Sequence, residues 1–158
     1  MITKTERYKR HRVGVIGGNN PDPVSLNNAE RMGQLIAENG YILVNGGRKG
    51  VMEASAKGAK SAGGLVIAIL PGETVDEANP YVDIAIPTGL GYMRNSVVVM
   101  NSDILVAIDG SYGTLSEIAY TQIQGKTVFG LNTWNIRGVT PLASPEEVIS
   151  HINRYFSQ

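Results

Sequence analysis

The stretch that decides the fold covers residues 102–117 and reads Ser-Asp-Ile-Leu-Val-Ala-Ile-Asp-Gly-Ser-Tyr-Gly-Thr-Leu-Ser-Glu. Its apolar part, residues 104–108, is typical of a strand buried on both faces of a parallel sheet. The turn that follows contains Gly110 and Gly113 and leads into a helix. Glycine lets a backbone approach a ligand closely, and the unpaired N–H groups of a helix's first turn attract anions. We therefore expect an anion site here, with Glu117 one turn inside the helix as the candidate active centre.

The rest of the chain alternates strands with helices. Five further apolar runs are predicted as strands, at residues 12–16, 41–44, 65–70, 82–86 and 127–131. Helical spacing predicts helices at residues 25–38, 51–61, 92–101 and 114–124, and a last one that begins at Pro145 with Ser144 and Glu147 as reciprocal caps. Strands that alternate with helices over short connections imply a parallel sheet with helices on both faces. We predict an α/β fold with one doubly wound, Rossmann-like domain over residues 1–158, of which residues 1–11 form a flexible basic arm.

Composition and charge exclude several classes of function. The chain has no cysteine, which excludes disulfides and thiolate metal sites, and no apolar run of transmembrane length, so we expect a cytoplasmic protein that does not contact membranes. The formal net charge is zero, and the five basic side chains within residues 1–12 leave the remainder acidic, which argues against a nucleic-acid partner. His11 and His151 lie near the ends of the chain, far in sequence from every glycine turn. We therefore expect no histidine triad, no metal and no cofactor.

Three strand-to-helix turns are rich in glycine. In a parallel sheet these turns lie together at the carboxyl ends of the strands, the edge at which such folds bind ligands. No G-x-G-x-x-G follows the first strand, so an ordinary dinucleotide site is not supported. Three glycine turns at one edge favour a phosphate-bearing, nucleotide-like ligand. The candidate phosphate- or nucleotide-binding residues are Gly17, Gly18, Asn19, Gly46, Gly47, Gly50, Gly110, Ser111, Gly113 and Thr114.

Two charged residues are candidates for chemistry, and each has a structural alternative. Glu117 completes a T-x-x-E capping box that begins at Thr114, so it is either a capping residue or a catalytic carboxylate. Arg94 is either a solvated helix residue or a cation beside Glu117, because its helix begins at the same edge of the sheet. That helix, residues 92–101, is apolar nearly all round and is therefore either fully buried or part of a subunit interface.

Together these motifs resemble the LOG-like Rossmann proteins, also called lysine decarboxylase-like. That family is marked by P-G-G-x-G-T-x-x-E after a strand, by an Arg-Lys pair on the preceding helix and by a glycine turn after the second strand. The corresponding stretches here are Asp109 to Glu117, Met93-Arg94-Asn95, and Gly46 to Met52, and the likeness covers residues 13–131. This sequence has Asp109 in place of the family proline, Ser111 in place of its second glycine and Asn95 in place of its lysine.

The resemblance implies a phosphoribohydrolase, an enzyme that cleaves the N-glycosidic bond of a nucleoside 5′-monophosphate. It does not imply a lysine decarboxylase. It implies Arg94 and Glu117 as the catalytic pair, Met93 as a further nucleotide contact, no metal, and a homodimer with helices at its interface or a higher homo-oligomer. A neighbouring branch contains the molybdenum-cofactor carrier proteins, which bind a phosphorylated pterin, and the three departures bring this sequence nearer to that branch. Two hypotheses therefore stand: a nucleotide hydrolase, or a non-catalytic carrier or sensor of a phosphorylated ligand.

Overall fold

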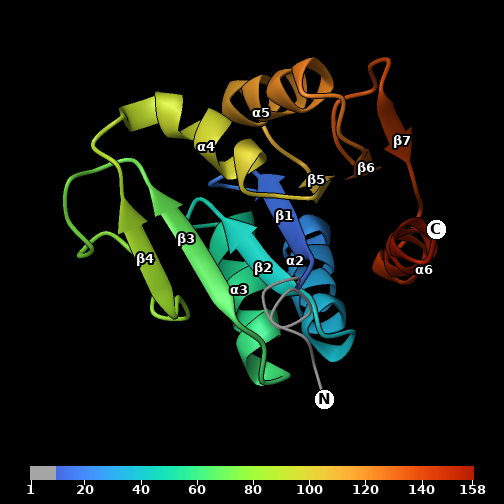
Figure 1. The fold of residues 1–158 in the computed structure, drawn as a ribbon, viewed down its shortest axis with the longest axis horizontal. Helices are drawn as coiled ribbons and strands as arrows, with labels where there is room; N and C mark the ends of the chain where they lie inside the picture. The colour runs from blue at the N-terminus through green and yellow to red at the C-terminus, as the bar shows by residue number, and fades with distance from the viewer. Residues whose placement is uncertain (1–9) are drawn as a thin grey trace.

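The structure, a computed structural model, describes residues 10–158 and contains one sheet of seven parallel strands (Figure 1). Most of the arm predicted at residues 1–11 lies outside the described residues. The strand order is β4-β3-β2-β1-β5-β6-β7. The strands are β1 (Arg12–Gly17), β2 (Ile42–Asn45), β3 (Val66–Leu70), β4 (Ile84–Pro87), β5 (Ile104–Ile108), β6 (Val128–Leu131) and β7 (Val139–Pro141). The predicted α/β, doubly wound fold class is confirmed.

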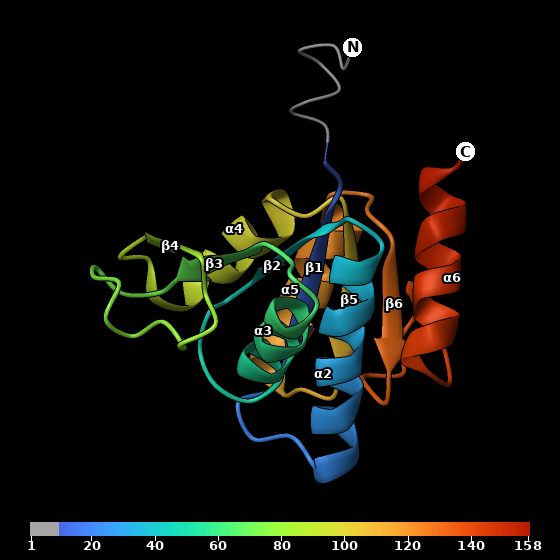
Figure 2. The same ribbon diagram turned by 90° about the horizontal axis from the view of Figure 1, so that it is seen from below.

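Helices cover both faces of the sheet (Figures 1 and 2). One face carries α2 (Pro23–Glu38), α3 (Val51–Ser61) and α6 (Pro145–Phe156), and the other carries the 3-10 helix η1 (Gly91–Met93), α4 (Arg94–Met100) and α5 (Tyr112–Ile123). The core divides in the same way, because alternate residues of β1 and β5 point to opposite faces. Val15 and Val106 belong to the cluster beneath α2 and α3, whereas Ile16 and Leu105 belong to the cluster beneath α4 and α5.

Several boundaries differ from those expected. The helix predicted to begin at Thr114 begins two residues earlier, at Tyr112, with Ser111 at the N-cap position. Thr114 is therefore not a cap, and the capping-box alternative for Glu117 is wrong. At α6 the hydroxyl of Ser144 accepts a hydrogen bond from the N–H of Glu147 as expected, at 3.2 Å. The Glu147 carboxylate reaches the N–H of Ala143, at 2.7 Å, rather than that of Ser144.

The helix expected at residues 92–101 is divided into η1 and α4, and it is not fully buried. Val98 and Val99 lie in the core, but Tyr92 is 89% exposed, Met93 68% and Met100 52%. None of the described helices is long and apolar enough to cross a membrane.

The order of the strands creates a crevice between β1 and β5. From β1 the chain builds the sheet outward through β2, β3 and β4, and it then returns to add β5, β6 and β7 on the other side. At such a switch point the loops after the two central strands turn to opposite faces and leave a crevice at their carboxyl ends. The glycine turns after β1 and β5 both lie at this crevice, where Gly18 approaches Gly110 so closely that an added Cβ would lie 3.3 Å from the Gly110 Cα.

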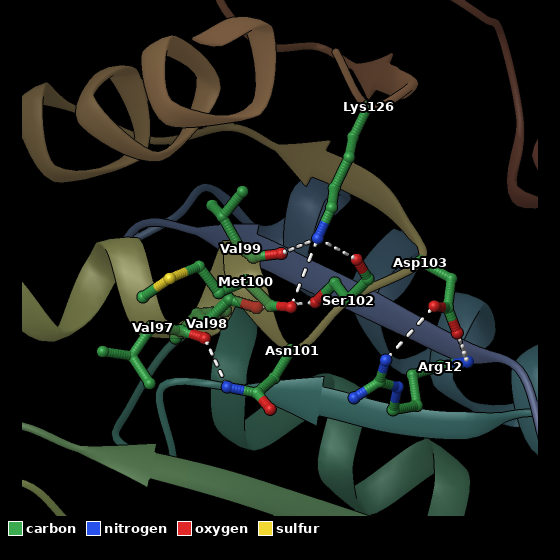
Figure 3. Close-up of polar contacts among 9 residues, drawn as sticks. All are labelled: Arg12, Val97, Val98, Val99, Met100, Asn101, Ser102, Asp103 and Lys126. Atoms are coloured by element: carbon green, nitrogen blue, oxygen red, sulfur yellow. Dashed lines mark hydrogen bonds and ion pairs between the residues drawn. The ribbon is translucent and has the colours of Figure 1, made fainter. Parts of the chain in front are cut away.

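The amino ends of the central strands are held by charged side chains (Figure 3). The Lys126 Nζ donates to the carbonyls of Val99 and Ser102, each at 2.7 Å, and so ends α4. The Asp103 carboxylate accepts the backbone N–H of Arg12 at 2.7 Å and the guanidinium of the same residue at 3.2 Å. These contacts tie the ends of β1, β5 and α4 to one another.

Candidate functional site

A cavity of about 470 Å³ opens at the crevice between β1 and β5. Eight of the residues predicted from the sequence line it: Gly17, Gly18, Asn19, Arg94, Ser111, Gly113, Thr114 and Glu117. They come from the loops after β1 and β5, from the first turn of α4 and from the first two turns of α5, which are far apart in the chain. The structure thus brings the two candidate catalytic residues to one cavity.

Four of the predicted glycines do not line this cavity, and three of them, Gly46, Gly50 and Gly110, pack against residues that do. Gly46 gives room to Arg94, because an added Cβ would lie 2.8 Å from the Arg94 Nη2. Gly50 has a φ of +67° and fits against the backbone of Gly18 and Asn19. Gly47 packs against Ala68, and Gly110 packs against Thr114 with a φ of +106°.

Met93, the remaining predicted contact, is 68% exposed and does not line the cavity. The cavity also has five lining residues that were not predicted as ligand contacts, which are Met52, Tyr92, Asn95, Tyr112 and Ser116. Met52 and Asn95 belong to motifs quoted above, so their positions carried a signal. The other three, Tyr92, Tyr112 and Ser116, lie within two residues of a predicted residue in the sequence. Closeness in sequence alone did not indicate that their side chains face the cavity.

Glu117 is a buried carboxyl group without a hydrogen-bond partner. The residue is only 7% exposed, and no side chain or backbone N–H among the described residues donates to its carboxylate. Desolvation by burial raises the pKa of Glu117 to about 8, and the nearby charge of Arg94 opposes this rise only in part. At neutral pH Glu117 is therefore mostly protonated, which suits a proton donor.

Arg94 is the cation that faces the same cavity. Desolvation lowers the pKa of the guanidinium, and the charge of Glu117 partly restores it. Within residues 10–158 no ion pair shorter than 4.0 Å joins the two side chains, and the Arg94 Nε is buried without a partner. Burying such a donor unpaired is unfavourable unless a ligand or water accepts its hydrogen bond. Arg94 and Glu117 thus both face the cavity without forming an ion pair with each other.

Asn95 connects Arg94 to the beginning of α5. Its Oδ1 accepts a hydrogen bond from the Arg94 Nη1, and its Nδ2 donates to the Ser116 hydroxyl at 3.1 Å and to the Gly113 carbonyl at 3.4 Å. Asn95 is only 3% exposed. The residue that replaces the family lysine therefore holds the guanidinium against the helix that carries Glu117.

The beginning of α5 is open to an anion. Ser111 makes no side-chain capping bond, and no described acceptor takes the N–H of Tyr112, Gly113 or Thr114. A Cβ added to Gly113 would meet only the Asn95 Nδ2, at 3.7 Å, so the approach to these groups is unobstructed. The N–H groups and the helix dipole together favour a phosphate at this position.

Asp109 faces away from this anion position. It adopts a φ of +53°, and its carboxylate accepts the N–H of Gly110 at 2.7 Å and the N–H of Asp22 at 3.2 Å. The negative charge is thus engaged between the loops after β1 and β5 instead of facing the N–H groups of α5. No group of three or more His, Asp or Glu side chains in the described part of the chain is placed to hold a metal ion.

Three known proteins show the range of the relatives. A protein of Archaeoglobus fulgidus, itself uncharacterized, is 47% identical over 144 residues, which cover 90% of this chain and 95% of that protein. The structure of the molybdenum cofactor binding protein from the phototrophic bacterium Rippkaea orientalis is similar with a TM-score of 0.89 and 38% identity, over 94% of this chain and 99% of that one.

The third relative is a probable cytokinin riboside 5′-monophosphate phosphoribohydrolase of rice, Oryza sativa, which is 31% identical over 94 residues. The match covers 54% of this chain but only 38% of the rice protein. The resemblance to LOG-like proteins and to the molybdenum-cofactor branch is therefore confirmed. The model of the SLOG cluster4 family matches residues 10–154, nearly all of the described chain, and the protein belongs to this family.

Proposed function

We propose that the protein binds a nucleoside 5′-monophosphate and hydrolyses its N-glycosidic bond, releasing the free base and ribose 5-phosphate. One observation carries the proposal: Glu117 is a buried carboxyl group that accepts no hydrogen bond from residues 10–158, with its pKa raised to about 8, in the cavity that Arg94 also faces. A carboxyl group that is protonated at neutral pH can donate a proton to a leaving group. The likeness to the rice phosphoribohydrolase supports the same reaction.

The 5′-phosphate would lie at the beginning of α5. The free N–H groups of Tyr112, Gly113 and Thr114 would donate to the phosphate oxygens. Gly17 and Gly18, in the loop after β1, would form the wall of the cavity on the other side of the phosphate. This position places the ribose, which is attached to the phosphate, between the helix terminus and the two charged side chains.

In the proposed reaction the bond between C1′ and the base nitrogen breaks, and its electron pair leaves with the base. Protonated Glu117 donates its proton to that nitrogen, and the resulting carboxylate stabilises the positive charge on the ribose. Water then adds to C1′ and gives a proton back to Glu117, which restores the acid form. Arg94 would orient the ribose phosphate and would hold the carboxylate in place while it is charged.

The direct test is an assay for ribose 5-phosphate release from a panel of AMP, GMP, IMP, CMP and UMP. We expect the wild-type protein to act on one or two of these nucleotides and Glu117→Gln to bind them without turnover. Asp103→Asn, a carboxylate change at the opposite edge of the sheet, is the control and keeps the activity. Turnover that survives in Glu117→Gln would remove the assigned role from this residue.

A second candidate is a carrier or sensor of a phosphorylated ligand such as molybdenum cofactor, which the structural likeness to the Rippkaea orientalis protein favours. The same open helix terminus would hold the phosphate of a pterin. The two functions differ in their need for Glu117, because a carrier requires no proton donor. Release of no ribose 5-phosphate from any nucleotide, together with thermal stabilisation by molybdenum cofactor in both wild type and Glu117→Gln, would establish the carrier.

We also propose that the protein is a cytoplasmic homodimer. The exposed apolar side chains of Tyr92, Met93 and Met100, with Leu90 beside them at 45% exposure, form a face on η1 and α4 that a second copy would cover. Light scattering coupled to gel filtration tests this assembly: Met93→Lys should dissociate a dimer, and a monomeric wild type would contradict the proposal.

A further inference from the structure

A second cavity, of about 290 Å³, adjoins the first. It is lined by Asn19, Arg48, Pro71, Gly91, Tyr92 and Arg94. Asn19, Tyr92 and Arg94 line both cavities, so a single ligand can extend from one into the other. The phosphate and ribose of a nucleotide do not require this second space if they lie at the beginning of α5.

The second cavity contains more cationic groups than carboxylates. Arg94 and Arg48 both line it, and the charge of Arg48 lowers the pKa of Arg94. The facing acid is Glu77, whose charge acts on Arg94 in the opposite direction and whose Oε2 accepts a hydrogen bond from the Arg48 Nη1 at 3.0 Å. Glu117 faces Arg94 from the first cavity and is mostly protonated at neutral pH. Two guanidinium groups are thus balanced by one carboxylate.

The donors of these arginines also exceed the acceptors that the chain provides. The Arg94 Nε is buried without a partner. Glu77 is already engaged, because its Oε1 accepts the N–H of Gly72 at 2.6 Å while its Oε2 binds Arg48. Arg48 donates to no other described acceptor and keeps 44% of its side chain exposed. An anionic group of a ligand would supply the missing charge and an acceptor for the exposed N–H groups of Arg48.

We propose that the second cavity is a subsite for a second phosphate group, so that the preferred ligand is a nucleotide with two separate anionic groups rather than a simple monophosphate. One phosphate lies at the beginning of α5, and the other lies between Arg48 and Arg94. This inference rests on the proposed function for the first cavity and adds the class of ligand. In the free protein Glu77 holds Arg48, and a second phosphate competes with Glu77 for that guanidinium.

Calorimetric titration with AMP, adenosine 2′,5′-bisphosphate and adenosine 3′,5′-bisphosphate tests the subsite. We expect at least one of the two bisphosphorylated probes to bind wild type about tenfold more tightly than AMP, a gain worth about 1.4 kcal/mol. Arg48→Gln should remove most of this gain and leave the affinity for AMP unchanged. Glu77→Gln should enlarge the gain in affinity from the second phosphate. The amide oxygen still accepts the Gly72 N–H, but the uncharged side chain no longer competes with the phosphate for the Arg48 guanidinium.

Lys49→Gln is the matched control. Lys49 carries the same charge in the same loop and is exposed, but it does not line either cavity, so its loss should leave the gain intact. Equal affinity for AMP and both bisphosphorylated probes, or a gain that Arg48→Gln keeps, would overturn the subsite while AMP binding and ribose 5-phosphate release remain. Failure of these three nucleotides, and of GMP, IMP, CMP and UMP as well, to bind would overturn the proposed function and the subsite together.

Discussion

The charged side chains Glu117 and Arg94 in the cavity differ from the charged side chains at the amino edge of the sheet in how far the chain satisfies them. At the amino ends of the strands, Lys126 donates to three carbonyls at the end of α4, and Asp103 receives two hydrogen bonds from Arg12 (Figure 3). At the carboxyl ends, Glu117 accepts no hydrogen bond from a described residue, and the Arg94 Nε has no partner.

This difference in hydrogen bonding distinguishes charged residues that stabilise the fold from charged residues that serve the proposed function. A charged group that the chain itself satisfies contributes to the stability of the fold, whereas a buried group left unsatisfied reduces stability and persists where a ligand needs it. We therefore assign the contacts of Lys126 and Asp103 to the stability of the fold, and Glu117 and Arg94 to the proposed reaction. Changes at the two edges should accordingly affect different measurements.

The largest expected effect is the loss of turnover in Glu117→Gln. Because general acid catalysis contributes about 10²–10⁴-fold, release of ribose 5-phosphate should fall by at least about a hundredfold, while nucleotide affinity changes little. Steady-state kinetics and calorimetry on the same preparation measure the two quantities. An equal loss of affinity and turnover would mean that Glu117 binds the ligand rather than acts on it.

The second-largest expected effect is a change of stability with pH that is caused by the titration of Glu117. Its pKa rises from 4.5 to about 8 on folding, so the folded state holds the proton more tightly than the unfolded state. The stability contributed by the neutral carboxyl is therefore complete below about pH 4.5 and is lost as the pH rises to about 8, by an amount on the order of a few kcal/mol.

Urea unfolding of wild type and Glu117→Gln at pH 5 and pH 9 isolates this contribution, since all other groups titrate alike in both proteins. The variant should gain stability relative to wild type at pH 9 compared with pH 5. A difference between the two proteins that does not change with pH would show that the carboxyl titrates normally.

At the amino edge, Lys126→Met should destabilise the protein without affecting the cavity. It removes the donor to the carbonyls of Val99, Met100 and Ser102, and charged hydrogen bonds of this kind contribute about 2 kcal/mol. Chemical denaturation measures the loss, and nucleotide affinity at a temperature where the variant is folded should equal that of wild type. A large change in affinity would contradict the division between the two edges.

The smallest effect on stability is expected for Gly46→Ala, at the carboxyl edge. The added methyl group would lie 2.8 Å from the Arg94 Nη2 and from the Met52 Sδ, which are the ends of flexible side chains and can move. Stability should fall by about 1 kcal/mol, whereas the displaced guanidinium should lower turnover about tenfold. Unchanged kinetics would mean that the position of Arg94 is not important for the reaction.

The sequence predicted the order of the strands and helices because apolar runs and glycine turns mark both. It also offered, as one of two alternatives for Arg94, a position beside Glu117, since helices that follow parallel strands begin at one edge of the sheet, and both residues line the cavity. It did not predict β7, a three-residue edge strand that ends in Pro141 and therefore lacks a strand signal. The seventh strand is recognisable only from its pairing with β6.

Helix starts and side-chain directions were harder to predict. The capping box failed because the turn at Asp109 and Gly110, both with positive φ, allows α5 to begin at Tyr112 and buries Thr114 against Gly110. The contacts of Asn95 and Arg48 depend on how separate loops approach each other in space, which spacing along the chain does not encode.

The most direct test of the central claim is the pKa of Glu117 itself. Carbon-detected NMR of the side-chain carboxyl, assigned by its absence in Glu117→Gln, would follow the titration in the free protein. We expect a midpoint near pH 8, because burial without a hydrogen bond from the described residues keeps the proton on the group. A midpoint near the ordinary value of 4.5 would contradict it, since Glu117 would then be charged at neutral pH and unable to act as the proton donor.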